Sequence, residues 1–160
     1  MTTKNIKTEI FNQFDKKWAL LTAGTLENFN TMTVSWGGMG TLWGKPVITV
    51  YVRPNRYTYG YMNDNDYFTV SFYPEMYRKD LGILGSLSGR DGDKVVKTCL
   101  TPVEVPHGMT FREAEATFVC HKLYAQDMDG TIIPDQVMAE FYASEPIHRI
   151  YIGEVVEVLE

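Results

Sequence analysis

Polar and apolar side chains alternate along residues 30–36, which read NTMTVSW. The odd positions carry Thr31, Thr33 and Ser35, and the even positions carry Met32, Val34 and Trp36. A period of two is typical of a β-strand that has one polar and one apolar face. A hydroxyl-bearing outer face is ordinary on an antiparallel strand, so the pattern by itself predicts a half-buried strand and does not require a ligand.

Short apolar or alternating runs predict further strands along the rest of the chain. They cover residues 18–25, 45–52, 68–72, 114–125 and 148–158, and a proline-bounded edge segment covers 101–107. Along the last strand the alternating positions are Ile150, Ile152, Val156 and Val158, and Gly153 is expected to form a bulge.

Helical patterns are short and interrupt the strands. Proline suits the first turn of a helix, so Pro54, Pro74 and Pro134 predict three helix starts, the second helix ending near residue 84. The third helix is expected to bury a stripe made of Val137, Met138, Phe141 and Tyr142. A shorter amphipathic piece surrounds Ile10, Phe11 and Phe14. Because strands dominate and no β-α-β alternation occurs, we expect a mainly β fold, an antiparallel barrel with short capping helices.

Glycines at 37, 38, 40 and 44 follow the alternating stretch and invite a test for nucleotide-binding motifs. A dinucleotide fingerprint needs a helix after the glycines, but residues 45–52 form a β run. A phosphate-binding P-loop needs Gly at position 39 and Ser or Thr at position 46, which are Met and Pro. Both motifs fail, and the glycines are expected to form a turn between two strands, with room for close backbone approach to a ligand.

Composition and charge set the class of protein. The 160 residues are 44% hydrophobic and 22% charged, which fits one domain covering 1–160. The net charge of −5 excludes a global basic field for nucleic acid or an anionic membrane. No apolar run approaches the roughly 18 residues of a membrane span, and the N-terminal MTTKNIKTEI has no signal-peptide pattern. Two cysteines without CxxC spacing are typical of a reducing compartment, so we expect a cytoplasmic protein.

An acidic protein can hold an anion only with a local cluster of cations, and two segments offer one. In the RPNRYT segment, Arg56 and Thr58 lie at a predicted helix start, where free N–H groups attract anions. The segment SGRDGDK at 88–94 combines flexible glycines with Arg90 and Lys94. Surface salt bridges for the arginines, and a solvated loop for the second segment, remain the alternatives.

Other catalytic constellations are not supported. Candidate metal ligands are Cys99, Cys120, His107, His121 and His148, and none of them has ligand spacing, so we expect no metal. A serine nucleophile elbow, GxSxG, is missing from the sequence, and we expect the carboxylates of Asp91 and Asp93 to be solvated.

In order and spacing, several blocks of the chain resemble the flavin reductase-like family with an FMN-binding split barrel, which includes flavoredoxin. The blocks are NTMTVSW at 30–36, KPVITVYVRPNRYTY at 45–59, YFTVSFY at 67–73, SGRDGDKV at 88–95, KLYAQDM at 122–128 and HRIYIGEVVEV at 148–158. The resemblance implies a homodimer of six-stranded antiparallel Greek-key split barrels that binds FMN non-covalently near the dimer interface.

The resemblance also assigns residues to parts of FMN. The residues beside the isoalloxazine and ribityl chain would be Asn30, Thr31, Met32, Thr33, Val34, Ser35 and Trp36, with Trp36 as the aromatic neighbour of the ring. The residues at the phosphate would be Arg56, Tyr57, Thr58, Ser88, Gly89, Arg90 and Lys94. His148 is expected to be structural because it opens a strand. A flavin needs donors at its ring edge, apolar contact on a face and positive charge at its phosphate, which agrees with these residue types.

Three functions are compatible with this resemblance. The first is an oxidoreductase that passes electrons from NAD(P)H or a protein donor through bound FMN to a flavin or another small acceptor. The second is a non-catalytic electron carrier like flavoredoxin, and the third is a simple FMN-binding protein. The compact chain shows no extension that would form a nicotinamide site, and a fold alone does not fix function.

Overall fold

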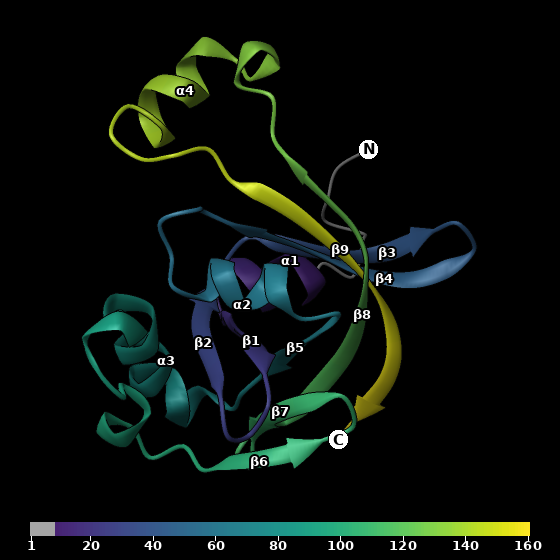
Figure 1. The fold of residues 1–160 in the computed structure, drawn as a ribbon, viewed down its shortest axis with the longest axis vertical. Coiled ribbons are helices and arrows are strands. Elements are labelled where there is room, and N and C mark those ends of the chain that lie inside the picture. The colour runs from purple at the N-terminus through teal and green to yellow at the C-terminus, as the bar shows by residue number, and fades with distance from the viewer. Residues whose placement is uncertain (1–8) are drawn as a thin grey trace.

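The computed structural model describes residues 9–160, and the beginning of the MTTKNIKTEI segment, on which the signal-peptide prediction rests, lies outside them. One seven-stranded antiparallel sheet dominates the fold (Figure 1). Its strands are β1 (Ala19–Gly24), β2 (Phe29–Val34), β3 (Gly37–Leu42), β4 (Lys45–Val52), β5 (Tyr67–Phe72), β8 (Ala116–Asp127) and β9 (Arg149–Leu159). They pair in the order β2-β1-β5-β8-β9-β4-β3. A separate hairpin pairs β6 (Pro102–Val105) with β7 (Gly108–Phe111), and β7 was not predicted.

The glycine-rich stretch after β2 is a strand, and the prediction of a turn there is wrong. Gly37 to Leu42 pair with β4 from Val50 to Lys45. The turn is shorter and lies at Trp43 and Gly44, whose φ angles are 53° and 71°. Two consecutive residues with positive φ are typical of a tight β-hairpin turn. Gly37 is required for packing, because a Cβ there would lie 2.7 Å from the Phe14 ring.

The large sheet is not closed into the predicted barrel of six strands. Because β3 pairs with β4, the sheet has seven strands, and its two edges are β2 and β3. Within the described residues β2 and β3 follow each other along the chain without pairing. The mainly β, antiparallel class is therefore confirmed, and the six-stranded Greek-key form is not.

The helices are short. They are α1 (Glu9–Asp15), α2 (Thr58–Asp64), α3 (Arg78–Ser86) and α4 (Asp135–Phe141), with single 3-10 turns at Glu75–Tyr77, Gly89–Asp91, Val95–Lys97 and Gly130–Ile132. α2 begins at Thr58, four residues after Pro54, because the chain first makes a turn in which Arg56 N–H donates to Arg53 O (3.0 Å). In the described part of the chain, no helix is long and apolar enough to cross a membrane.

Apolar side chains bury both faces of β1. Leu21 packs into a cluster with Met32, Val50 and Phe68, whereas Leu20 packs into a second cluster with Leu84. The threonine face of β2 is consequently covered as well: Thr33 Oγ1 donates to Leu81 O of α3 (2.5 Å). Of the expected outward row of hydroxyls, Thr33 therefore lies under α3 and Thr31 bonds to β1 within the sheet.

Residues 128–148, called the arm below, leave the sheet between β8 and β9 and carry α4 away from it (Figure 1, top). The base of the arm is closed by an ion pair between Asp127 and Arg149 (2.8 Å) and by Met128 N–H donating to His148 O (3.1 Å). The prediction that α4 buries an apolar stripe is wrong. Val137, Met138, Phe141 and Tyr142 are all half-buried or exposed, and among residues 9–160 no residue of α4 is buried.

The bulges of the β8–β9 pair also differ from the expectation at Gly153. The register shifts leave Val156 on β9 and Leu123 on β8 without a direct partner, whereas Gly153 pairs regularly with Lys122 and Ile48. Glycine is needed at 153 for a different reason. A Cβ there would lie 2.6 Å from the Phe68 ring, so the two strands could not approach the core as closely.

Candidate functional site

Two adjoining pockets lie along β2. The first, called the basic pocket, has a volume of about 180 Å³ and is lined by Asn30, Met32, residues 55–58, residues 85–90 and Lys94. The second, called the Trp36 pocket, also measures about 180 Å³ and is lined by residues 32–36, Tyr51, Arg53, Arg56 and His148. Met32 and Arg56 belong to both, so the pockets form one continuous site that follows the strand.

The three sequence segments singled out above meet at the basic pocket. Asn30 on β2 donates from Nδ2 to Thr58 Oγ1 at the start of α2 (2.8 Å), which joins the first segment to the second. Gly89 brings the third segment onto both. A Cβ at Gly89 would clash with Asn30 Oδ1 and would lie 2.7 Å from the Tyr57 ring, so only glycine permits this approach.

Lys94 is buried at the floor of the basic pocket, with 5% of its surface exposed. Its Nζ donates to Leu84 O (2.8 Å) and Leu87 O (3.1 Å), near the carbonyl end of α3. Burial and the charge of Arg56 lower the pKa of Lys94 to about 8. An ammonium group has three donors, so one N–H remains for a ligand in the pocket.

Arg56 stands beside Lys94 and is held in a similar way. Its Nη2 donates to Gly85 O (3.3 Å). Burial lowers the pKa of Arg56, and Arg53 adds to the shift while Glu145 opposes it. The charge of Arg56 disfavours the ionised form of Lys94, as Arg53 does for Arg56, and a bound anion would favour the charged form of both. This electrostatic arrangement favours an anionic group in the basic pocket.

Arg90 and Ser88 have more peripheral positions. Arg90 is exposed at the rim, where Nη1 donates to Asn55 O (2.8 Å) and the guanidinium lies 5.5 Å from the centre of the Tyr57 ring. Ser88 Oγ accepts a hydrogen bond from Arg90 N–H (3.2 Å) and so caps the short turn that carries Gly89. Both residues shape the loop that closes the pocket.

The Trp36 pocket is aromatic and touches the arm. Trp36 is 42% exposed, and its ring centre lies 5.2 Å from Phe141 and 5.6 Å from His148. His148 is buried, and its Nδ1 lies 2.7 Å from Tyr142 Oη. Burial, aided by Arg53, lowers the pKa of His148 to about 4, so the imidazole is neutral near pH 7. His148 was expected to be structural, yet it also lines this pocket.

Of the predicted site residues, Thr31 is the one that lines neither of these two pockets, although it lines a neighbouring pocket of about 260 Å³ together with Asn30, Tyr57, Gly89 and Lys94. Its Oγ1 lies 2.8 Å from Thr22 Oγ1 and donates to Leu21 O, so its role is to join β2 to β1. Sequence reasoning did not assign Tyr51 or Arg53 to the site, although both line the Trp36 pocket. Arg53 belongs to the RPNR segment and Tyr51 precedes it on β4, so their proximity to Arg56 was the available signal.

The site can bind a flat amphipathic molecule with an anionic end. Met32, Val34 and Trp36 offer apolar contact, the strand offers polar groups along one edge, and one end holds the buried Lys94 and the half-buried Arg56. Across residues 9–160 no group of three His, Cys, Asp or Glu side chains could hold a metal ion.

Comparisons with known proteins identify the family. The family model described as "Flavin reductase like domain" matches residues 11–160. The chain belongs to this family. A comparison with curated proteins finds no match.

Several solved structures of flavin-related proteins share the fold. Flavoredoxin from Methanosarcina acetivorans is 19% identical with a TM-score of 0.70, covering 90% of this chain and 68% of its own. An FMN-binding protein from Thermus thermophilus is 23% identical with a TM-score of 0.69, covering 89% and 70%. An NADH:FAD oxidoreductase from Streptomyces globisporus, in complex with NAD and FAD fragments, is 16% identical with a TM-score of 0.69, covering 94% and 78%. At these identities the likeness shows the fold that the flavin reductase family shares.

Proposed function

We propose that this protein is an FMN-dependent oxidoreductase that passes electrons from NAD(P)H, or from a protein donor, through bound FMN to a flavin or another small acceptor. The observation that carries the proposal is the pair of adjoining pockets, with the buried Lys94 and the half-buried Arg56 at one end and an exposed indole at the other. Membership of the flavin reductase family supports a flavin as the ligand of this site.

The residues of the site fit FMN in one orientation. Lys94 and Arg56 would bind the phosphate, because both are already desolvated and both keep N–H donors for an anion. The edge of β2 from Asn30 to Ser35 would follow the ribityl chain and the ring edge, and Trp36 would contact the ring. Gly89 would let the loop close over the phosphate end without a side chain in the way.

The chain's own residues would bind and orient the cofactor rather than react covalently. When bound, FMN supplies the hydride and electron chemistry, and the protein tunes it. His148 would present a neutral imidazole to the ring end, and Tyr142 fixes its orientation by a hydrogen bond at Nδ1.

We also propose that the protein forms a homodimer. An apolar groove of about 420 Å³ is lined by residues of β3, β4, β8 and β9, among them Met39, Phe118, Val155, Val156 and Val158. Trp43, at the tip of the β3–β4 hairpin, is 66% exposed, and Val137 on α4 is exposed as well. Exposed apolar surface of this kind is typical of an interface between copies. Sedimentation velocity would show a monomer mass if this part of the proposal is wrong.

The proposal also includes several expectations that rest on the sequence alone. They are a single domain over residues 1–160, a cytoplasmic location, and no nucleic acid, membrane or metal among the partners. The free thiols of Cys99 and Cys120 agree with a reducing compartment.

A spectroscopic experiment tests the function. The purified protein is mixed with FMN, desalted, and then treated with NADH or NADPH without oxygen. Retained flavin absorbance that bleaches supports the reductase. Absorbance that is retained but does not bleach favours the electron-carrier alternative, for which the exposed ring end of the site would be accessible to a protein donor. A protein that retains no flavin, and shows no binding in a titration, contradicts the cofactor assignment.

A further inference from the structure

The arm, residues 128–148, carries most of the net charge of the protein. The chain has 20 acidic and 15 basic side chains, and the arm contains no Lys or Arg but four of the acidic residues, Asp129, Asp135, Glu140 and Glu145. All four are exposed, and within residues 9–160 none of them forms an ion pair with a basic side chain. Outside the arm the two signs nearly balance, so negative charge is concentrated on this one projection.

Exposed apolar side chains lie among these carboxylates. Ile132, in the 3-10 turn Gly130–Ile132, is 81% exposed, and Val137 on α4 is exposed as well. Glu140 follows Val137 by three residues, so the two lie on the same side of the helix. We call Ile132, Val137 and the four carboxylates the arm surface. Apolar groups bordered by charged ones are typical of the surfaces by which proteins dock on each other.

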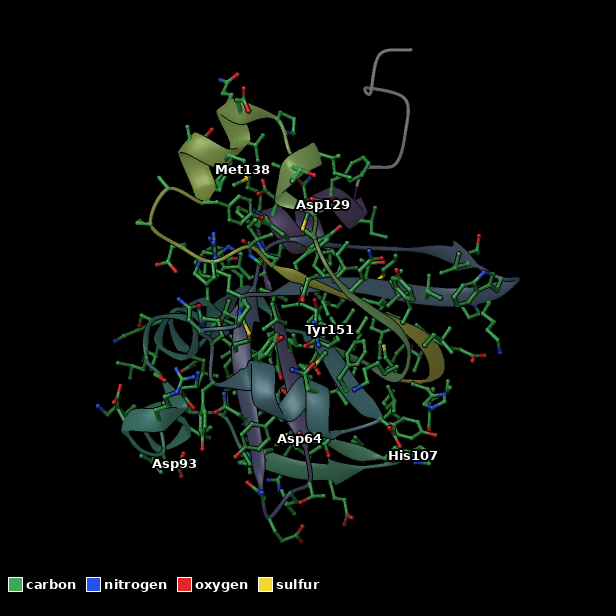
Figure 2. All side chains as sticks on the ribbon, turned by 45° about the horizontal axis from the view of Figure 1, so that its top comes forward. Asp64, Asp93, His107, Asp129, Met138 and Tyr151 are labelled. Atoms are coloured by element: carbon green, nitrogen blue, oxygen red, sulfur yellow. The ribbon has the colours of Figure 1, made fainter. Side chains whose placement is uncertain are left out.

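Contacts within the arm give the arm surface a fixed shape. A Cβ at Gly130 would lie 2.6 Å from Ile147 Cδ1 and 3.8 Å from Met138 Cε, so the two limbs and α4 pack against one another. Figure 2 shows Met138 on α4 and Asp129 on the limb that leaves β8. A surface that is already ordered loses less conformational entropy when a partner docks on it.

The arm borders the end of the site that would hold the flavin ring. The ring centres of Phe141 on α4 and Trp36 are 5.2 Å apart. Arg53, which lines the Trp36 pocket, donates from Nη1 to Pro146 O on the limb that leads back to β9 (2.8 Å). Trp36 is 42% exposed, so this end of the site is open beside the arm. A protein that docks on the arm surface therefore comes close to the Trp36 pocket.

We propose that the arm surface docks a protein electron donor whose own redox centre is surrounded by Lys and Arg side chains. This proposal rests on the proposed function, because it takes the flavin ring to lie in the Trp36 pocket, and it names the class of donor. A haem or iron–sulfur donor gives up one electron at a time, whereas a flavin takes up two electrons, together with protons from solvent, when it is fully reduced. The donor must therefore dock and leave twice. Small charged surfaces suit such brief encounters, because complementary charge raises the association rate more than the affinity.

A second copy of the chain is a less suitable occupant of the arm surface. A copy carries the same net charge of −5, and the apolar groove proposed above as the dimer contact has Glu157 in its lining. Like charges brought together disfavour association. In Figure 1, α4 and the C-terminal end of β9, which lines the groove, lie at opposite ends of the molecule. The arm surface and the groove are therefore separate surfaces.

Surface plasmon resonance with a basic c-type cytochrome as the probe tests the proposal, and an acidic ferredoxin is the negative control. The immobilised protein carries FMN. The double variant Asp135→Asn/Glu140→Gln removes two charges from α4. Glu75→Gln/Glu104→Gln is its matched control, because it removes two exposed charges outside the arm and leaves the same net charge.

A second pair of variants tests the apolar part of the arm surface. Ile132→Ser removes the exposed isoleucine. Val96→Ser is its matched control, because Val96 is 74% exposed and also lies in a 3-10 turn, Val95–Lys97, outside the arm.

We expect wild type to bind the cytochrome at least about tenfold more tightly than the ferredoxin at an ionic strength of about 10 mM. The α4 double variant should weaken cytochrome binding about three- to tenfold, mainly through a slower association, whereas its control should change it less than about twofold. This difference should shrink when the ionic strength is raised to about 0.15 M, because salt screens exposed charges. Ile132→Ser should weaken binding about threefold, and Val96→Ser should leave it unchanged.

Cross-linking with a carbodiimide, which joins carboxylates to lysines, gives a second readout that does not depend on electron transfer. Links from arm carboxylates to cytochrome lysines are expected. Links from the arm to a second copy of the chain would assign the arm to the dimer and overturn the proposal. Equal losses of cytochrome binding in the two double variants would also overturn it, since net charge alone would then attract the cytochrome.

The outcomes separate this inference from the function on which it rests. If wild type retains FMN that NAD(P)H bleaches, but binds the cytochrome no more tightly than the ferredoxin, the docking proposal is wrong and the proposed function stands. If wild type retains no flavin, both proposals fail.

Discussion

Replacing Lys94 by methionine separates phosphate binding from structural support. Methionine keeps a long apolar stem in the buried position but removes the ammonium group, which bonds to Leu84 O and Leu87 O. A charge-assisted hydrogen bond to phosphate is worth about 1.5–3 kcal/mol, so FMN affinity should fall roughly ten- to 150-fold. Riboflavin has no phosphate, and its affinity should change less than about twofold. The measured quantity is the ratio of FMN to riboflavin affinity by fluorescence titration.

Lys97→Met is the matched control, because Lys97 is exposed on the neighbouring 3-10 turn and lines neither pocket. A destabilised fold would lower the affinity for both ligands together, whereas loss of a phosphate contact lowers only that for FMN. An FMN-to-riboflavin ratio equal to that of wild type would refute the reasoning. Lys94 would then be only a cap for the carbonyl end of α3.

The lowered pKa of Lys94 adds a pH test to the same experiment. With a pKa of about 8 in the free protein, Lys94 loses its proton as the pH rises through 8. A bound phosphate favours the charged form, so FMN binding takes up a proton in this range. FMN affinity should therefore fall between pH 7.5 and 9.5 in wild type, by at most tenfold per pH unit, and should stay flat in Lys94→Met. Riboflavin, which carries the same ring, is the control for titration of the flavin itself.

Three further predictions concern stability and packing. The pKa of His148 is lowered to about 4, so between pH 6.5 and 4 the unfolded chain binds a proton that the folded chain lacks. The free energy of unfolding should therefore fall by up to about 3 kcal/mol as the pH drops from 6.5 to 4. Urea unfolding of His148→Gln should lack this part of the pH dependence. Gly89→Ala should weaken FMN at least about tenfold while the midpoint of thermal unfolding changes little, because its Cβ would separate the exposed loop from Asn30; unchanged FMN affinity would contradict the close approach. Gly153→Ala should lower the free energy of unfolding by about 1–3 kcal/mol, because the added methyl group would overpack the core. Gly82→Ala is the control, since a Cβ there on α3 meets open space, and it should raise the free energy of unfolding by up to about 1 kcal/mol. Equal effects of the two substitutions would contradict this account.

The local pattern of polar and apolar residues was sufficient to predict most of the strands and the segments that build the site. The alternation at residues 30–36, the RYT turn and the SGR loop each had a chemical signature, and the structure brings Asn30, Thr58 and Gly89 together as neighbours. The order of polar and charged residues thus indicated a ligand site before any contact was known. Their assignment to FMN remains a prediction that the experiments above test.

The predictions that the structure contradicts share one physical cause. Each of them depended on which other part of the chain pairs with or packs against the segment concerned. Glycine composition predicted a turn at 37–44, but backbone pairing with β4 makes it a strand. The apolar spacing of α4 predicted burial, but in the described part of the chain α4 projects from the sheet and none of its residues is buried. Arg53 and His148 enter the Trp36 pocket only because β4 and the end of the arm meet beside Trp36. Periodicity gives the faces of an element and cannot give its neighbours.

The closed base of the arm allows its outer part to change in length. The two limbs of the arm start side by side, because β8 and β9 pair as far as Asp127 and Arg149. Doubling the length of such a loop costs only about 0.6 kcal/mol in closure entropy. The part of the arm that leads back to β9 should not be lengthened, because Phe141 contacts Trp36 and Tyr142 contacts His148. A short peptide inserted between Ile133 and Pro134 would therefore leave the sheet intact, and would provide an attachment point for a fluorophore or a redox centre on the same arm that borders the Trp36 pocket.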